Sequence, residues 1–128
     1  MQLFAFAASN RRRSLNAQLL GVALACLRET QNTDKGIAVD EAAYEDCALP
    51  LFDHQLVEDR HPYPPAVQTL HERLERADVY VLAVPEYNWS APSVVKNMID
   101  WMSVYPQVAT AGKPAFLMCA TPSERGGV

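Results

Sequence analysis

The chain has 128 residues, of which 49% are hydrophobic, and this size suits one domain with a buried core. Its 11 basic and 15 acidic residues give a net charge of -4, which argues against nucleic acid or an anionic membrane as a partner. No apolar run approaches the ~20 residues of a membrane helix. Three widely spaced cysteines without a C-x-x-C pair predict neither disulfides nor a zinc site and fit a reducing cytoplasm. We expect a cytoplasmic protein that acts on small molecules.

The first half of the chain alternates an apolar run with a helical pattern. Residues 3–8 form a short, continuous apolar run, which predicts a strand buried on both faces. From Ser14 onward the period changes to about 3.6, which predicts a helix. Its apolar stripe is Leu15, Leu19, Ala23 and Leu27. Residues 37–40 alternate in polarity and predict a short edge strand, whereas residues 41–65 carry several prolines without a clear period and predict a long loop.

The second half repeats this alternation. A helix on Val67, Leu70 and Leu74 leads into the apolar run 79–84, which predicts a central strand. We expect that helix to turn four charged residues outward: Glu72, Arg73, Glu75 and Arg76. Another helix is expected after Ser90, which can cap it, with Pro92 in its first turn. Its apolar face is Val95, Met98, Ile99 and Met102. Residues 115–120 predict a fourth strand with Cys119 in the core, followed by a polar loop.

This order of elements predicts an α/β fold with a mainly parallel sheet built from right-handed βαβ units. Ligands of such sheets bind beyond the carboxyl ends of the strands. Three polar loops follow predicted strands, at residues 9–16, 85–90 and 121–127. We therefore expect any binding site to be built from these loops.

The first loop has the residues of an anion site. It joins a buried strand to a helix start, where free N–H groups and the helix dipole favour a phosphate. Ser9 and Ser14 offer hydroxyls, Asn16 an amide and Arg11 a planar guanidinium. The alternative is a solvated turn in which Ser14 is an ordinary helix cap.

The second and third loops are suited to a planar ring. Residues 85–92 combine polar and aromatic side chains after the most apolar strand, although Tyr87 and Trp89 could instead fill core or a subunit contact. In the third loop, Gly126 and Gly127 would let the backbone approach a ligand or simply form a turn.

Taken together, these segments resemble the NADPH-dependent FMN reductase family, which includes quinone, azo-dye and chromate reductases. The resemblance spans nearly the whole chain, and its middle motif is the most specific. The matching motifs are Ser9-x-Arg11-x-x-Ser14-x-Asn16, Pro85-x-Tyr87-Asn88-x-Ser90-x-Pro92, Lys96-Asn97-x-Ile99-Asp100-Trp101, Gly112-Lys113-Pro114, Gly126-Gly127 and Leu49-Pro-Leu-Phe52.

The resemblance implies a flavodoxin-like three-layer sandwich that binds FMN. The phosphate would be held by Ser9, Arg11, Ser14, Leu15 and Asn16, the isoalloxazine ring would lie along Pro85, Glu86, Tyr87 and Asn88, and Thr121, Gly126 and Gly127 would close over its pyrimidine side. It also implies NADPH as electron donor and a homo-dimer or homo-tetramer. The family continues into another helix, a fifth strand and a last helix, so residues 1–128 are expected to be one domain that lacks these elements. Such a domain would expose the edge of its fourth strand and one flank of the helix expected after Ser90.

The expected activity is an FMN-dependent NAD(P)H oxidoreductase that passes electrons to a small acceptor such as a quinone, an azo compound or a metal oxyanion. Because the cofactor carries this chemistry, no catalytic side chain is expected. No metal site is expected either, since His54, His61 and His71 are irregularly spaced and fit surface positions. Two alternatives remain, a flavodoxin-type electron carrier and a truncated subunit without catalysis.

Overall fold

A computed structural model of the chain describes residues 1–30, 36–59 and 62–122. Within these ranges, one sheet contains four strands that all pair in parallel, in the order β2-β1-β3-β4. The strands are β1 (Gln2–Ala7), β2 (Ala38–Ala42), β3 (Val79–Ala83) and β4 (Ala115–Met118). The predicted edge position of the second strand and the central position of the third are therefore confirmed.

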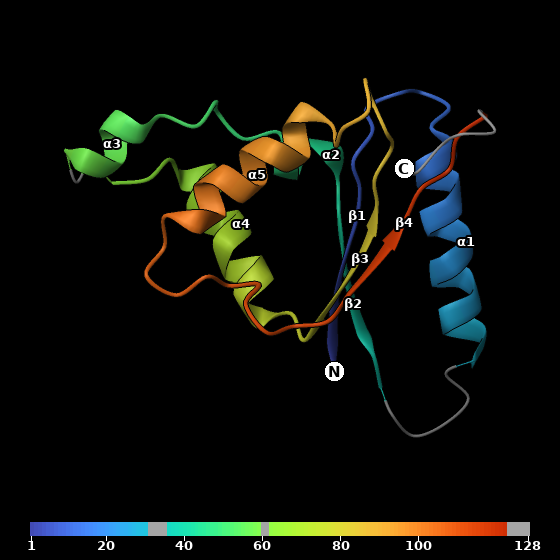
Figure 1. Cartoon of the computed structure of the whole chain (residues 1–128). Coiled ribbons are helices and arrows are strands. Elements are labelled where there is room, and N and C mark those ends of the chain that lie inside the picture. The colour runs from blue at the N-terminus through green and yellow to red at the C-terminus, as the bar shows by residue number, and fades with distance from the viewer. Residues whose placement is uncertain (31–35, 60–61, 123–128) are drawn as a thin grey trace.

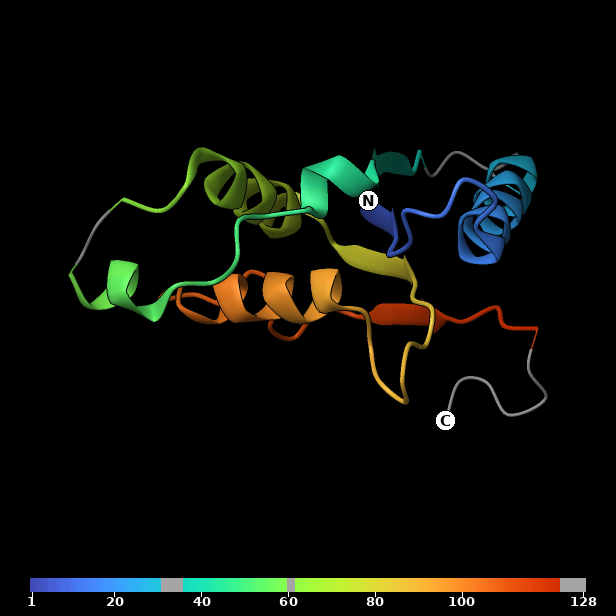
Figure 2. The same ribbon diagram turned by 90° about the horizontal axis from the view of Figure 1, so that it is seen from above.

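Helices cover both faces of this sheet and give the molecule three layers. For the described part of the chain, Figures 1 and 2 show α1 alone on one side of the strands, with α4 and α5 on the other. The helices are α1 (Leu15–Thr30), α2 (Tyr44–Cys47), α3 (His54–Glu58), α4 (Pro65–Arg76) and α5 (Ser93–Ser103). Among the described residues, none of these helices combines the length and apolarity needed to cross a membrane.

The central strand β1 divides the core into two apolar clusters. Phe4 and Phe6 pack on the side of α4 and α5, whereas Leu3 and Ala5 pack with α1. This division follows from the alternation of side chains along a strand. Because both clusters bury β1, its sequence from Leu3 onward is continuously apolar, as predicted.

The connections that leave β1 and lead into β3 run on opposite faces of the sheet. The chain passes from β1 through α1 to β2, then returns across the other face through α4 to β3, which lies on the far side of β1. Such a reversal opens a crevice between the two adjoining strand ends. The loops after β1 and β3 are therefore neighbours.

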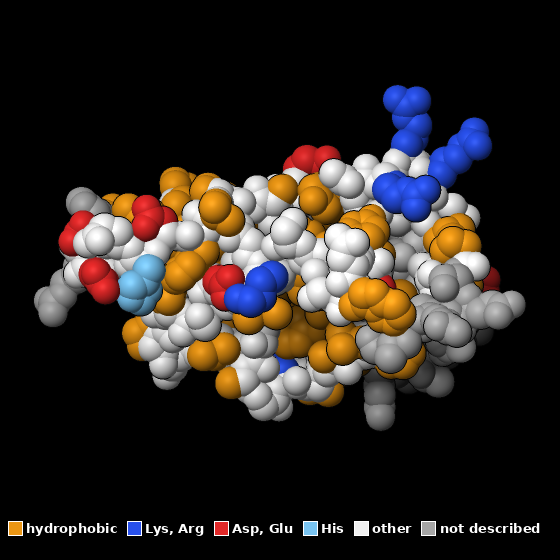
Figure 3. All heavy atoms as spheres, turned by 45° about the horizontal axis from the view of Figure 1, so that its top comes forward, with side chains coloured by type: hydrophobic (Ala, Val, Ile, Leu, Met, Phe, Trp, Pro, Cys, Tyr) orange, Lys and Arg blue, Asp and Glu red, His pale blue; other side chains and the backbone are white. Residues whose placement is uncertain are grey.

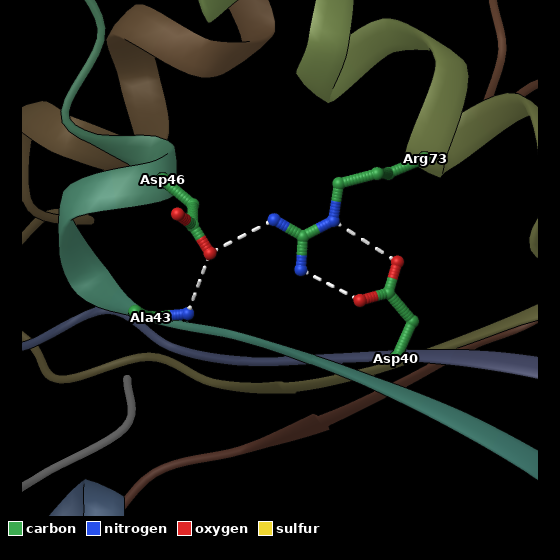
Figure 4. Close-up of polar contacts among 4 residues, drawn as sticks. All are labelled: Asp40, Ala43, Asp46 and Arg73. Atoms are coloured by element: carbon green, nitrogen blue, oxygen red, sulfur yellow. Dashed lines mark hydrogen bonds and ion pairs between the residues drawn. The ribbon is translucent and has the colours of Figure 1, made fainter.

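A charged network ties β2 to the helical layer (Figure 4). Arg73 of α4 donates to both carboxylate oxygens of Asp40, with N···O distances of 3.0 and 2.6 Å, and to Asp46 at 2.9 Å. Asp46 also accepts from the backbone N–H of Ala43. The expectation that Arg73 faces solvent was wrong, because its side chain turns toward the edge of the sheet and is largely buried there.

A second set of hydrogen bonds fixes the segment that follows α2. From α5, the Asn97 side chain donates to the carbonyls of Leu49 and Pro50 and accepts from the N–H of Phe52. The indole N–H of Trp101 also donates to Pro50. These bonds hold the segment against α5, although the segment itself is neither helix nor strand.

Three other local predictions were wrong. Residues 41–65 contain the short helices α2 and α3 and are not one continuous loop. The buried face of α1 consists of Asn16, Leu20 and Leu24, shifted by one residue from the predicted stripe. The N-cap position of α5 is occupied by Pro92, not Ser90, and Pro92 makes no side-chain capping bond.

Two reactive side chains also differ from expectation. Cys119 is exposed, because β4 ends at Met118 and the chain leaves the sheet there. His71 is not a plain surface residue, since its ring stacks on Tyr105 at 3.6 Å and its Nε2 is buried. His54 is exposed as expected, and His61 lies outside the described residues.

The strand β4 leaves apolar side chains open on both faces. Phe116 is paired with Val81 on the α1 side and is 59% exposed, whereas Leu117 is paired with Leu82 on the opposite side and is 68% exposed. Beside β4, an apolar cavity of about 320 Å³ runs along α5 past Met98 and the exposed Ile99. The prediction that α5 would keep one uncovered flank is confirmed.

Candidate functional site

The three loops at the carboxyl ends of β1, β3 and β4 meet in one open pocket of about 90 Å³. It lies at the reversal point between β1 and β3, where the fold places ligands. The lining residues are Ser9, Arg11, Ser14, Leu15, Asn16, Pro85, Glu86, Tyr87, Ala120, Thr121 and Pro122. The first and second loops, which we expected to build one binding site, therefore do lie together in the structure.

The side of the pocket formed by the first loop contains groups that can donate hydrogen bonds to an anion. Ser14 precedes α1, and its buried hydroxyl oxygen accepts from the N–H of Ala17, which makes it a helix cap. The remaining first-turn N–H groups of α1 have no carbonyl partner within the helix and face outward. Ser9 accepts from the N–H of Arg11, which closes the turn before the helix. This arrangement creates a positive helix end with a hydroxyl on each side.

The charge around this wall is positive. Arg11, Arg12 and Arg13 are all exposed, and only Arg11 of the three lines the pocket. Figure 3 shows basic side chains standing out from the surface at this end of the molecule. A phosphate group at the start of α1 would therefore meet a guanidinium as well as backbone donors.

The second loop has a tight turn next to the pocket. Tyr87 and Ser90 exchange two backbone hydrogen bonds of 2.9 and 3.1 Å, and Asn88 and Trp89 between them have φ values of 53° and 63°. Positive φ at both central residues defines a type I′ turn. Asn tolerates this conformation, but for a bulky residue such as Trp it is strained. The turn holds the Trp89 side chain 73% exposed instead of in the core.

The side of the pocket formed by the third loop, which we call the third wall, is tied to the start of α1 by the Asn16 side chain. Asn16 is 4% exposed, and its Nδ2 donates to the Ala120 carbonyl at 3.0 Å while its Oδ1 accepts from the Ala120 N–H at 2.9 Å. Thr121 and Pro122 follow directly and line the pocket. The start of α1 and the chain beyond β4 are thereby joined.

The structure brings together most of the residues that the sequence singled out. All five first-loop residues, together with Pro85, Glu86, Tyr87 and Thr121, line the pocket. Asn88 is adjacent but is not among the lining residues, and Gly126 and Gly127 lie outside the described residues. Ala120 was missed, because it was assigned to the end of the fourth strand. Among the described residues, no three His, Cys, Asp or Glu side chains are placed to hold a metal ion.

Comparison with known proteins identifies the family. A family model described as NADPH-dependent FMN reductase matches residues 1–128, and the chain belongs to this family. Quinone reductase from Escherichia coli (strain K12) is 38% identical over 79 residues, which are 62% of this chain and 42% of that protein. NAD(P)H:quinone oxidoreductase from Solanum tuberosum is 35% identical over 120 residues, which are 93% of this chain and 58% of that protein.

Solved structures show the same fold. FerB from Paracoccus denitrificans, described as a flavoenzyme NAD(P)H:(acceptor) oxidoreductase, superposes with a TM-score of 0.73 at 29% identity, covering 96% of this chain and 62% of that one. An azoreductase from Bacillus anthracis gives a TM-score of 0.70 at 16% identity, covering 92% and 67%. The fold is therefore flavodoxin-like, and the order β2-β1-β3-β4 is the first part of the 2-1-3-4-5 order of that fold. The chain spans about half the length of the curated relatives it matches.

Proposed function

We propose that this chain is the FMN-binding part of an NAD(P)H-dependent oxidoreductase that passes electrons to a small oxidised acceptor, such as a quinone, an azo compound or a metal oxyanion. The observation that carries the proposal is the single pocket built by the loops after β1, β3 and β4. Family membership and the printed activities of the relatives, several of which are quinone reductases, support it. In the same proposal, residues 1–128 form one domain.

The donors around the pocket fit a flavin phosphate. The positive end of α1, the Ser9 and Ser14 hydroxyls and the Arg11 guanidinium would surround a dianion. Leu15 and Asn16 would contribute backbone N–H groups of the first helical turn. No carboxylate of the first loop opposes this charge, since residues 9–16 contain neither Asp nor Glu.

The ring of the cofactor would lie beside the second loop. Pro85, Glu86 and Tyr87 form this side of the pocket, Asn88 stands next to them in the strained turn, and Thr121 faces them from the third loop. Gly126 and Gly127 complete the proposed set. When bound, FMN accepts hydride from a nicotinamide and returns electrons to the acceptor, so the side chains only bind, orient and shield it.

The subunit arrangement and the cellular location are also part of the proposal. We assign a homo-dimer or homo-tetramer in the cytoplasm that uses NADPH as donor. Exposed large apolar side chains support association, since Leu51 is 85% and Trp89 73% exposed. Apolar surface of this kind, where it is contiguous, is typical of subunit contacts.

Titration of the purified chain with FMN, followed by quenching of flavin fluorescence, tests cofactor binding. NADPH oxidation in the presence of a quinone then tests turnover. We expect Arg11→Ala to weaken FMN binding about tenfold or more, because a charge-assisted hydrogen bond is lost. Arg13→Ala is the matched control, since Arg13 is equally exposed but does not line the pocket.

The possible outcomes separate the alternatives. Failure to bind FMN would overturn the proposal and leave a chain without catalysis. Binding without turnover of NADPH would instead indicate an electron carrier. Equal effects of Arg11→Ala and Arg13→Ala would place the phosphate elsewhere.

A further inference from the structure

We infer that Asn16 is a positioning residue that clamps the wall formed by Ala120, Thr121 and Pro122 onto the start of α1, and that its amide is not a ligand of the FMN phosphate. This inference rests on the proposed function for its consequence in flavin binding. The clamp itself rests on two hydrogen bonds within the chain.

Both polar ends of the Asn16 side chain are engaged by one residue, Ala120. Its Nδ2 donates to the Ala120 carbonyl and its Oδ1 accepts from the Ala120 N–H, at 3.0 and 2.9 Å. This two-bond pairing reproduces the pattern of a backbone ladder. It directs the amide toward the third wall, and the side chain is almost fully buried there.

The β-sheet ends before the wall formed by Ala120, Thr121 and Pro122. The ladder between β3 and β4 ends with the pair Ala83 and Met118, and the bond from the Val84 N–H to the Met118 carbonyl is its last extension. Ala120 lies beyond this point, yet its backbone groups are partly buried and need partners. The Asn16 amide supplies both partners, so its two hydrogen bonds hold the backbone just beyond the last paired residue of β4.

Asn16 differs from Arg11 of the same loop in how its side chain is held. Arg11 is exposed and free to turn toward an anion, whereas Asn16 cannot release Ala120 without leaving its N–H and C=O unsatisfied. Loss of the clamp would therefore displace the wall that borders the ring side of the pocket. Affinity should fall for any flavin, with or without a phosphate.

A positioning role for Asn16 predicts that Asn16→Ala and Arg11→Ala differ in their effects on FMN and riboflavin binding. In Asn16→Ala, we expect the affinities for both flavins to fall about tenfold and in the same ratio. In Arg11→Ala, only FMN binding should weaken. Asn10→Ala serves as the matched control, because Asn10 belongs to the same loop, is exposed and does not line the pocket.

Hydrogen exchange of the Ala120 amide tests the clamp without flavin. We expect protection in the wild-type chain and about tenfold faster exchange in Asn16→Ala. The near-isosteric Asn16→Asp keeps an acceptor for this N–H and guards against a variant that fails to fold. It should retain protection at Ala120.

Two results would overturn the inference. One is a fall in FMN affinity with unchanged riboflavin affinity in Asn16→Ala, which would make the amide a phosphate ligand. The other is an Ala120 amide that exchanges equally fast in the wild-type chain and in Asn16→Ala. If the wild-type chain bound neither flavin, the proposed function would fail, while the exchange measurement would still decide whether the clamp exists.

Discussion

Arg73 of α4 binds the Asp40 carboxylate of β2 in a two-bond fork, with N···O distances of 3.0 and 2.6 Å. The guanidinium side chain is only 15% exposed and also reaches Asp46. Because β2 is an edge strand, this fork fastens the middle of the strand to the helical layer. An edge strand held by a charged side chain is also protected from pairing with other chains.

Replacement of Arg73 by Met should therefore destabilise the protein. Met keeps most of the apolar stem but leaves Asp40 and Asp46 without their common partner, at a cost of roughly 1.5–3 kcal/mol. Urea unfolding monitored by circular dichroism measures the change. Arg76→Met is a suitable control, because Arg76 is exposed on the same helix. Equal stabilities of the two variants would contradict the role given to the fork.

Acid should weaken this network by protonating the Asp46 carboxylate. The hydrogen bond from Arg73, followed by that from the Ala43 N–H, lowers the pKa of Asp46 below its ordinary value of 3.8. A carboxylate whose pKa is lower in the folded state stabilises the fold above its unfolded pKa and loses this effect as the pH falls through the folded pKa.

The corresponding test compares the wild-type chain with Asp46→Asn. The free energy of unfolding is measured from about pH 6 down to about pH 3. We expect the variant to be less stable at pH 6, by well under ~1 kcal/mol because Asp46 is half exposed, and the difference to shrink in acid. A difference that grows as the pH falls would have the wrong sign.

The three cysteines should differ sharply in reactivity. Burial raises the pKa of Cys47 to about 12, so its thiol stays protonated at neutral pH, whereas Cys26 and Cys119 are exposed. Brief treatment of the native protein with iodoacetamide, followed by peptide mass spectrometry, should find label on Cys26 and Cys119 but not on Cys47. Labelling in denaturant is the control and should modify all three. Rapid modification of native Cys47 would show that the helix α2 opens readily.

The strained turn offers a stabilising substitution. Trp89 has φ 63° and a side chain that is 73% exposed, so its replacement removes little buried surface. Glycine adopts this conformation without strain, and Trp89→Gly should raise the free energy of unfolding by roughly 1 kcal/mol. Asn88→Gly should change it less, because Asn already tolerates positive φ. Chemical denaturation of both variants gives the comparison, and a loss of stability in Trp89→Gly would mean that the indole makes contacts that outweigh its backbone strain.

The parts of the fold that are set by long apolar runs could be predicted from the sequence. The buried runs at β1 and β3 and the amphipathic α4 indicate a parallel sheet, and the loops after such strands must meet at one edge. The short helices α2 and α3 could not be predicted, because four or five residues do not show a helical period. Tertiary contacts, such as those of Asn97 with the Leu49 and Pro50 carbonyls, decide the path of this segment.

The buried face of α1 shows why periodicity alone was insufficient for the site. The predicted stripe began at Leu15, but Leu15 is exposed at the pocket and the polar Asn16 is buried in its place. Nothing near Asn16 in the sequence indicates that its partner is Ala120. The residues that line the pocket could thus be predicted, while their division into donors toward a ligand and supports of the loops required the structure.

The tie between Asn16 and Ala120 spans 104 positions of the chain. Contacts between such distant positions pay a large loop-closure cost and form only after more local structure exists. During synthesis, the start of α1 leaves the ribosome long before its partner does. The nascent chain therefore passes through a stage in which Asn16 has been synthesised and Ala120 has not, so the proposed cofactor site is incomplete until Ala120 emerges.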